Sequence, residues 1–209
     1  MKKLRFENIV IVDYGMGNLR NVHNAFNKLG FRSKISADIK DIEKATHLVL
    51  PGVGGFKDAM SELKKKDLIE PIRCAIESKV PFLGICLGMQ LLFESSEEFG
   101  ENEGLSVLKG KVVRFNENNV PLIPHVGWND VDILRPLPEF KDIKNKSFFY
   151  FLHSYYCVPK EDIAVAKCFY YEDFTACVKK DNIFACQFHP EKSQDAGLTL
   201  LTNFVSVWS

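Results

Sequence analysis

Cys86 is the first residue of the chain whose surroundings suggest chemistry. It lies in the segment GICLGMQ, between Gly84 and Gly88, at the end of an apolar run. Glycines at this spacing leave room for a sharp turn between a strand and a helix, as in the Gly-x-Ser-x-Gly turn that displays the nucleophile of other α/β enzymes. At a helix N-terminus, free N–H groups and the helix dipole would favour the thiolate. The alternative is a buried cysteine that only fills space in the core.

A cysteine nucleophile needs a base, because an unperturbed thiol is only about 3% ionised at pH 7. His189 is the strongest candidate, since the apolar segment ACQF ends at it and Pro190 prevents the strand from continuing. Glu191 follows two residues later and could hydrogen-bond the far nitrogen of the imidazole, fixing its tautomer as the third member of a triad does. We therefore predict a catalytic triad of Cys86, His189 and Glu191.

The remaining histidines and cysteines give weaker signals. His23 falls in a predicted helix and His47 at a strand start, which favours structural or surface roles, whereas His125 and His153 stay open as binding residues. The six cysteines form no CxxC pair and lack the dense spacing of a secreted disulfide scaffold. Cys186 and His189 could not hold zinc without two further ligands. We therefore expect neither a metal nor another cofactor.

Composition excludes several classes of partner. The 209 residues carry 27 basic and 27 acidic side chains, so no net charge draws the chain to nucleic acid or anionic membranes. No apolar run reaches the roughly 18 residues that span a bilayer, and the N-terminal segment lacks a signal-peptide pattern. The segment DYGMGN lacks the third glycine of a dinucleotide fingerprint. We expect a cytoplasmic protein.

Hydrophobic patterning indicates one α/β domain over residues 1–209. In the first half, apolar runs alternate with amphipathic stretches, which is typical of βαβ units and a parallel sheet. Strands are expected over 8–15, 32–36, 46–56 and 80–85, with one long helical stretch after residue 56 that breaks or kinks near Pro71. In the second half, short β-like runs predict antiparallel strands added to or beside this core, before a last helix over about 193–206.

The sequence resembles the class I glutamine amidotransferases, whose hallmark is a Cys-His-Glu triad on an α/β sheet. GICLGMQ and QFHPEKS carry this resemblance, which extends over essentially the whole chain. Four further segments, DYGMGNLRNV, LPGVGGF, PHVGWN and FYFLHSYY, are similar to the glutaminase subunits of imidazole glycerol phosphate synthases. The resemblance implies a flavodoxin-like fold, with a mixed, mostly parallel sheet flanked by helices.

The same resemblance implies that the chain hydrolyses glutamine to glutamate and ammonia through a γ-glutamyl thioester. An oxyanion hole would come from the backbone at Leu87 and at Val53, whose peptide the neighbouring glycines allow to reorient. Gln90 lies four residues after Cys86, on the same helix face. The residues implied in substrate binding are Gly52, Gln90, Ser154 and Tyr155.

A glutaminase with no recognisable acceptor site implies a partner. In the family this partner is a (β/α)8-barrel cyclase, which forms a heterodimer with the glutaminase and takes up its ammonia to make imidazole glycerol phosphate and AICAR in histidine biosynthesis. PHVGWN resembles an interface segment, with Trp128 and Asn129 as the interface residues. Two alternatives stay open. One is a paralogous synthase with another acceptor, such as a surface sugar, and the other is a stand-alone hydrolase of γ-glutamyl substrates.

Overall fold

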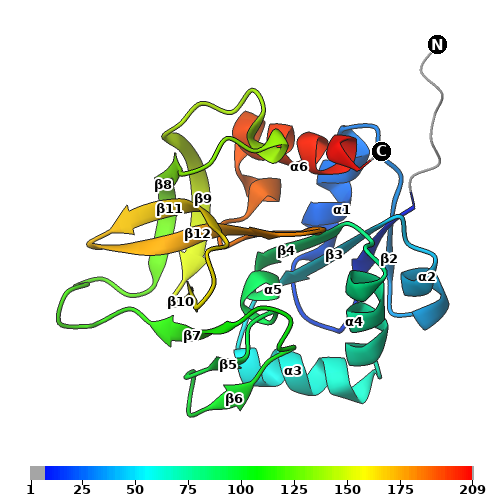
Figure 1. Cartoon of the computed structure of the whole chain (residues 1–209), viewed down its shortest axis with the longest axis horizontal. Coiled ribbons are helices and arrows are strands. Elements are labelled where there is room, and N and C mark those ends of the chain that lie inside the picture. Colours follow the sequence, from blue (N-terminus) through cyan, green and yellow to red (C-terminus); the bar gives the residue numbers. More distant parts are fainter. Residues whose placement is uncertain (1–7, 209) are drawn as a thin grey trace.

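A nine-stranded mixed sheet forms the centre of the molecule (Figure 1). The structure is a computed structural model and describes residues 8–208. Strand order within these residues is β2-β1-β3-β4-β13-β12-β11-β8-β9, of which the first five strands pair in parallel. The parallel strands are β1 (Ile9–Val12), β2 (Ser33–Ser36), β3 (His47–Gly52), β4 (Phe82–Cys86) and β13 (Ile183–Cys186). Except for β2 at the edge, they are buried throughout, which explains their continuous apolar sequences.

Helices cover both faces of the parallel part (Figure 1). One apolar core contains Phe26 of α1 (Leu19–Lys28) and Phe204 of α6 (Gln194–Val207). The other core lies under α2 (Ile39–Glu43), α3 (Phe56–Lys65) and α4 (Ile69–Glu77). This arrangement confirms the α/β fold predicted from the sequence. No helix in residues 8–208 has the length and apolar character needed to cross a membrane.

The helical stretch after residue 56 divides at a different place from the one predicted. It ends at Lys65 and resumes at Ile69, with Asp67 between them at φ 53°. Pro71 is the third residue of α4, where a helix does not need an N–H donor. The predicted break is therefore present, but it lies a few residues before Pro71 and is not caused by the proline, because proline is tolerated in the first helical turn.

The second half of the chain extends the sheet with antiparallel strands and adds a small second sheet. The antiparallel strands are β8 (His125–Ile133), β9 (Ser147–His153), β11 (Ala164–Tyr170) and β12 (Glu172–Lys180). The small sheet contains β5 (Ser95–Ser96), β6 (Asn102–Glu103), β7 (Gly110–Arg114) and β10 (Tyr155–Pro159). A run that reads as one strand, SFFYFLHSYYCV, changes sheet at Ser154, so residues on either side of Ser154 have different neighbours.

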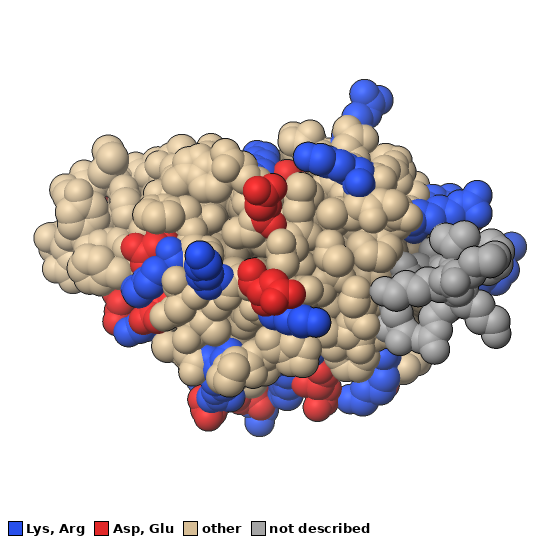
Figure 2. Space-filling model, turned by 90° about the horizontal axis from the view of Figure 1, so that it is seen from above, with Lys and Arg blue, Asp and Glu red and all other residues tan. Residues whose placement is uncertain are grey.

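One turn of α-helix, α5 (Leu87–Gln90), and two short 3-10 helices, η1 (Pro138–Phe140) and η2 (Pro190–Lys192), complete the elements of residues 8–208. Acidic and basic side chains are interspersed over the face of the molecule seen in Figure 2, in line with the balanced composition.

Candidate active site

Cys86 occupies the last position of β4, at the carboxyl edge of the parallel strands. Its backbone has φ 54° and ψ −112°, a strained conformation for a residue with a side chain. The sequence then continues directly into α5 (Leu87–Gln90), so the thiol is displayed at a sharp strand-to-helix turn. Cys86 is only 5% exposed. Such strain persists only where the surrounding structure enforces it, and it is concentrated at functional sites.

Gly84 and Gly88 give this turn its space, although the positive φ belongs to Cys86 itself. A Cβ atom at Gly88 would lie 1.7 Å from the carbonyl oxygen of Leu50 on β3. At Gly84 it would lie 3.0 Å from the Cβ atom of Ala185 on β13. α5 is a single turn, so it contributes little of the helix-dipole effect expected from the sequence.

His189 and Glu191 come from the segment that follows β13, the strand beside β4. The Nδ1 atom of His189 lies 2.9 Å from Oε1 of Glu191, and both side chains are at least 96% buried. A carboxylate only accepts hydrogen bonds, so Nδ1 carries the hydrogen and Nε2 remains for the reaction. The backbone N–H of His189 donates to the Tyr150 carbonyl oxygen at 2.9 Å, which ties this segment to β9.

The electrostatics of His189 couple it to Cys86. Burial lowers the pKa of His189, but its interactions with Cys86 and then with Glu191 outweigh burial and raise this pKa to about 10. Nε2 of His189 has no hydrogen-bond partner within residues 8–208. The arrangement thus favours an imidazolium beside the Cys86 sulfur, which is the charge pair that activates a cysteine nucleophile.

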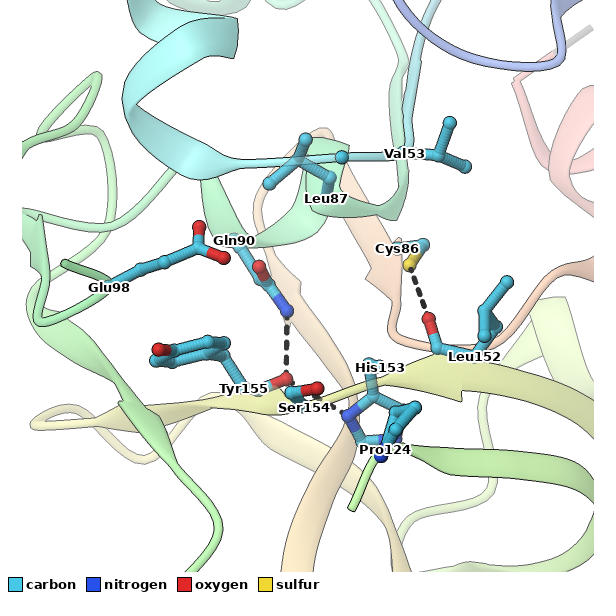
Figure 3. Close-up of a pocket in the computed structure, with 11 residues that line it drawn as sticks. Val53, Cys86, Leu87, Gln90, Glu98, Pro124, Leu152, His153, Ser154 and Tyr155 are labelled. Carbon is cyan, nitrogen blue, oxygen red and sulfur yellow. Dashed lines mark hydrogen bonds between the residues drawn. The ribbon is translucent and has the colours of Figure 1, made fainter.

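A pocket of about 240 Å³ opens over the Cys86 sulfur (Figure 3). It has the size of a small metabolite rather than of a nucleotide or a peptide chain. Polar and apolar groups from five separate parts of the chain line it: Val53, Gly54, Cys86, Leu87, Gln90, Glu98, Pro124, Leu152, His153, Ser154 and Tyr155. The structure therefore brings Val53, Leu87, Gln90, Ser154 and Tyr155 to one cavity, as the sequence predicted for a site.

Gly52 is placed differently from the substrate contact expected of it. It does not line the pocket but pairs with Cys86 across β3 and β4. A Cβ atom at Gly52 would lie 2.4 Å from the hydroxyl oxygen of Tyr14, so the glycine is needed for close packing. Gly54, by contrast, lines the pocket with φ +100°, a conformation that favours glycine.

Glu98 and Gln187 are polar residues of this region that sequence reasoning missed. Glu98 lies in the acidic run ESSEEFG, which reads as a solvated loop, yet it lines the pocket and accepts a hydrogen bond from the Phe56 N–H group. Gln187 is fully buried and donates to the Cys86 sulfur at 3.6 Å. The sequence could have drawn attention to Gln187, because it is the one polar residue in the otherwise apolar segment IFACQF.

The two histidines left open by the sequence form a buried pair. Nδ1 of His125 lies 3.1 Å from Nε2 of His153, and His153 lines the pocket. Burial lowers the pKa of His125 to about 4 and that of His153 to about 3. Both rings are consequently neutral near pH 7 and serve as a fixed wall of the pocket, packed against Phe151 and Phe174.

An exposed apolar face adjoins the pocket on β8 and β9. Trp128 is 45% exposed and packs edge-on against Tyr150, with Val126, Phe148 and Leu152 exposed on the same face. Asn129 points to the opposite face, where its side-chain amide donates to the Phe169 carbonyl oxygen at 3.0 Å. The structure thus separates the two residues that the sequence assigned to one interface, because neighbouring residues of a strand alternate between its faces.

Comparison with known proteins agrees with this geometry. The family model for glutamine amidotransferase class-I matches residues 10–207. The chain belongs to the class-I glutamine amidotransferase family. This finding confirms the family resemblance seen in the sequence.

Two relatives of this amidotransferase are named imidazole glycerol phosphate synthase subunit HisH. The protein from Syntrophotalea carbinolica is 48% identical over 202 residues, which cover 94% of this chain and 98% of that one. The protein from Caldanaerobacter subterraneus is 50% identical over 197 residues, which cover 94% and 96%. These identities confirm the more specific resemblance to the glutaminase subunits of that synthase.

Solved structures share the fold of this amidotransferase at lower identity. PurLQS from Thermotoga maritima is 18% identical, with a TM-score of 0.74 over 97% of this chain and 99% of that one. Another structure, of a glutamine amidotransferase, is 19% identical with a TM-score of 0.75 over 95% and 98%. They confirm the fold class predicted from the sequence.

Proposed function

We propose that this chain is the glutaminase subunit of an imidazole glycerol phosphate synthase. In this role it releases ammonia from glutamine and passes it to a (β/α)8-barrel cyclase in histidine biosynthesis. The observation that supports the proposal is the Cys86 sulfur at a pocket of amino-acid size, together with His189, which is coupled electrostatically to Cys86 and hydrogen-bonded to Glu191. The two HisH relatives, similar over nearly their full lengths, support the choice of synthase. A cytoplasmic address is part of the same proposal.

The first half of the reaction makes a thioester. The Cys86 thiolate attacks the side-chain carboxamide carbon of glutamine, and the carbonyl oxygen becomes an oxyanion. The N–H groups of Leu87 and Val53 are the proposed oxyanion donors, each contributing about 3 kcal/mol to barrier lowering. The His189 imidazolium then gives its Nε2 proton to the departing nitrogen. The carbon–nitrogen bond breaks, leaving ammonia and a γ-glutamyl thioester on Cys86.

The second half regenerates the enzyme. Neutral His189 takes a proton from water, whose oxygen attacks the thioester carbon. The carbon–sulfur bond then breaks and releases glutamate, while the proton on His189 restores the imidazolium–thiolate pair. Throughout, the Glu191 carboxylate at 2.9 Å holds Nδ1 protonated, so that only Nε2 exchanges protons with the reacting atoms.

Substrate recognition is proposed to involve charge as well as shape. Glutamine carries an α-ammonium and an α-carboxylate in addition to the carboxamide. Glu98 is a carboxylate on the side of the pocket opposite Cys86 (Figure 3), which suits the ammonium group. Ser154 and Tyr155 lie at the junction of β9 and β10 and are proposed to contact the amino-acid end of glutamine, as is Gln90 of α5.

The docking face of the cyclase is proposed to be the apolar surface around Trp128. It adjoins the pocket through Leu152, whose side chain is exposed on that surface while its carbonyl oxygen lies 3.7 Å from the Cys86 sulfur. Ammonia released at Cys86 would then start its path beside the interface. An aromatic anchor in an apolar surface is typical of interface energetics. Asn129, which faces away from this surface, is not part of the proposed face.

The decisive experiment measures glutamate release by the purified chain, alone and with the cyclase subunit from the same organism. We expect weak activity alone, strong stimulation by the cyclase, and loss of activity in a Cys86→Ala variant. Strong activity without a partner would favour a stand-alone hydrolase instead. A strain that lacks the gene and still grows without histidine would point to a synthase with another acceptor.

A further inference from the structure

We propose that Gln187 is a positioning residue of the glutaminase reaction, which donates an N–H group to the Cys86 sulfur and holds Gln90 as a hydrogen-bond acceptor toward the pocket. The inference rests on the proposed function, because it assigns a further residue to the same site. Gln187 is fully buried and follows the end of β13 by one residue. It reaches the site from behind the pocket wall rather than lining the pocket.

The direction of these amides is set by one backbone carbonyl group. The carbonyl oxygen of Tyr155 can only accept hydrogen bonds. Nε2 of Gln90 lies 2.9 Å from it, and Nδ1 of His153 lies at the same distance. Figure 3 shows the nitrogen of Gln90 directed at Tyr155 and its oxygen on the other side. A reversed Gln90 amide would place oxygen against oxygen, so the nitrogen must face Tyr155.

The orientation of the Gln90 amide fixes the orientation of the Gln187 amide. The second hydrogen of Gln90 Nε2 meets Oε1 of Gln187 at 3.0 Å. Nε2 of Gln187 is therefore the atom that lies 3.6 Å from the Cys86 sulfur, since a reversed amide would set two donors against each other. Both N–H groups of Gln90 are used within the protein, and only its oxygen is left to meet substrate. A buried network of this kind has one satisfied arrangement.

Two neighbours of the Cys86 sulfur favour opposite protonation states of the thiol. The Leu152 carbonyl oxygen, 3.7 Å away, can interact favourably only with a protonated thiol. The N–H of Gln187 can donate to the thiolate, and hydrogen bonds to an ionised group are about twice as strong as neutral ones. Gln187 therefore favours the nucleophilic form. At the other end, the Gln90 oxygen can accept an N–H from glutamine.

Two substitutions separate these effects in the full-length chain. Gln187→Leu removes both the donor to Cys86 and the acceptor that holds Gln90. Gln187→Glu keeps an acceptor for Gln90 but replaces the N–H donor beside the sulfur. We expect iodoacetamide to alkylate Cys86 about tenfold more slowly in both variants, measured by mass spectrometry of the Cys86 peptide. With the cyclase present, kcat should fall about ten- to hundredfold in both, whereas KM for glutamine should rise severalfold only in Gln187→Leu.

Asn182→Asp is the matched control. Asn182 is another buried amide, which donates to the carbonyl oxygens of Ile76 and Val80 and does not line the pocket. Its variant should melt at a lower temperature with no change in Cys86 alkylation or in KM. Loss of packing alone would expose Cys86 and speed alkylation, the opposite of the expected direction.

Wild-type alkylation rates in both Gln187 variants would overturn the inference, and so would an equal rise of KM in both. Either result leaves the proposed function intact as long as Cys86→Ala abolishes glutamate release. Glutamate release by Cys86→Ala would instead refute the function itself. The two failures are thereby distinguishable.

Discussion

Replacing Glu191 by glutamine tests the triad most directly. The substitution keeps the size of the side chain but removes the charge that faces His189. The two side chains are almost fully buried, and the Nδ1–Oε1 distance is 2.9 Å. A glutamine amide could also present its NH2 group to Nδ1, which would favour the wrong imidazole tautomer. We therefore expect the variant to fold but to lose most of its glutaminase activity.

The magnitude follows from the geometry. Opposite unit charges at this separation attract by about 6 kcal/mol at an effective dielectric constant of about 20. Desolvation of the buried carboxylate offsets part of this attraction, so a net loss of about 2 to 4 kcal/mol is expected. Since about 1.4 kcal/mol corresponds to a factor of ten, kcat/KM should fall about 30- to 900-fold.

The pH profile gives an independent readout. Burial lowers the pKa of His189, while Cys86 and Glu191 raise it to about 10. Removing the Glu191 charge lowers this pKa, so the imidazolium is lost at a lower pH and the basic limb of the kcat/KM profile moves toward acid. Glu139→Gln is the control, because Glu139 is a buried carboxylate paired with Lys179 at 2.7 Å instead. A Glu191→Gln variant with activity within threefold of wild type and an unmoved basic limb would refute the role given to Glu191.

Three further predictions concern packing, docking and pH. Gly88→Ala should lower the free energy of unfolding by about 3 kcal/mol or more in urea titration, because the new Cβ atom would lie 1.7 Å from the Leu50 carbonyl oxygen. Gly30→Ala is the control: Gly30 has φ +84° and open space around it, so this substitution should lower the free energy of unfolding by only about 1 to 2 kcal/mol. Trp128→Ala should weaken cyclase binding about ten- to hundredfold in calorimetry without slowing Cys86 alkylation, and Leu134→Ala, an exposed apolar residue outside the docking face, should leave binding unchanged. Stability should fall by roughly 5 kcal/mol from pH 6.5 to pH 4, because the pKa values of His125 and His153 are lowered to about 4 and about 3 and the unfolded chain therefore binds protons first. A His125→Phe variant with an undiminished dependence of stability on pH would contradict this assignment.

Sequence reasoning reached the parts of the site that lie on the parallel strands. Cys86 ends one apolar strand and His189 follows another, and the carboxyl ends of adjacent parallel strands meet at one edge of a sheet. The spacing of Glu191 from His189 is local and needs no knowledge of the fold. The α/β class was equally accessible, because buried parallel strands read as continuous apolar runs.

The residues that sequence reasoning missed are positioned by long-range contacts. Glu98 reaches the pocket through a loop that contacts the start of α3, 42 residues earlier. The proposed role of Gln187 depends on its hydrogen bonds to Gln90 and Cys86, which lie 97 and 101 residues before it. The sequence also did not predict that the chain moves from one sheet to the other at Ser154, because a continuous β-like run does not indicate where one sheet ends and another begins.

Successive side chains of β9 point to opposite faces of the sheet, which explains how one strand contributes to both the pocket and the proposed docking face. Its register pairs Val126 with Leu152 and His125 with His153, which directs the Leu152 side chain outward and the His153 side chain inward. The Leu152 carbonyl oxygen meanwhile lies against the Cys86 sulfur. A one-residue slip would exchange these roles at every position. The hydrogen bond of His153 to the Tyr155 carbonyl oxygen opposes such a slip, because it ties the end of β9 to the group that orients Gln90.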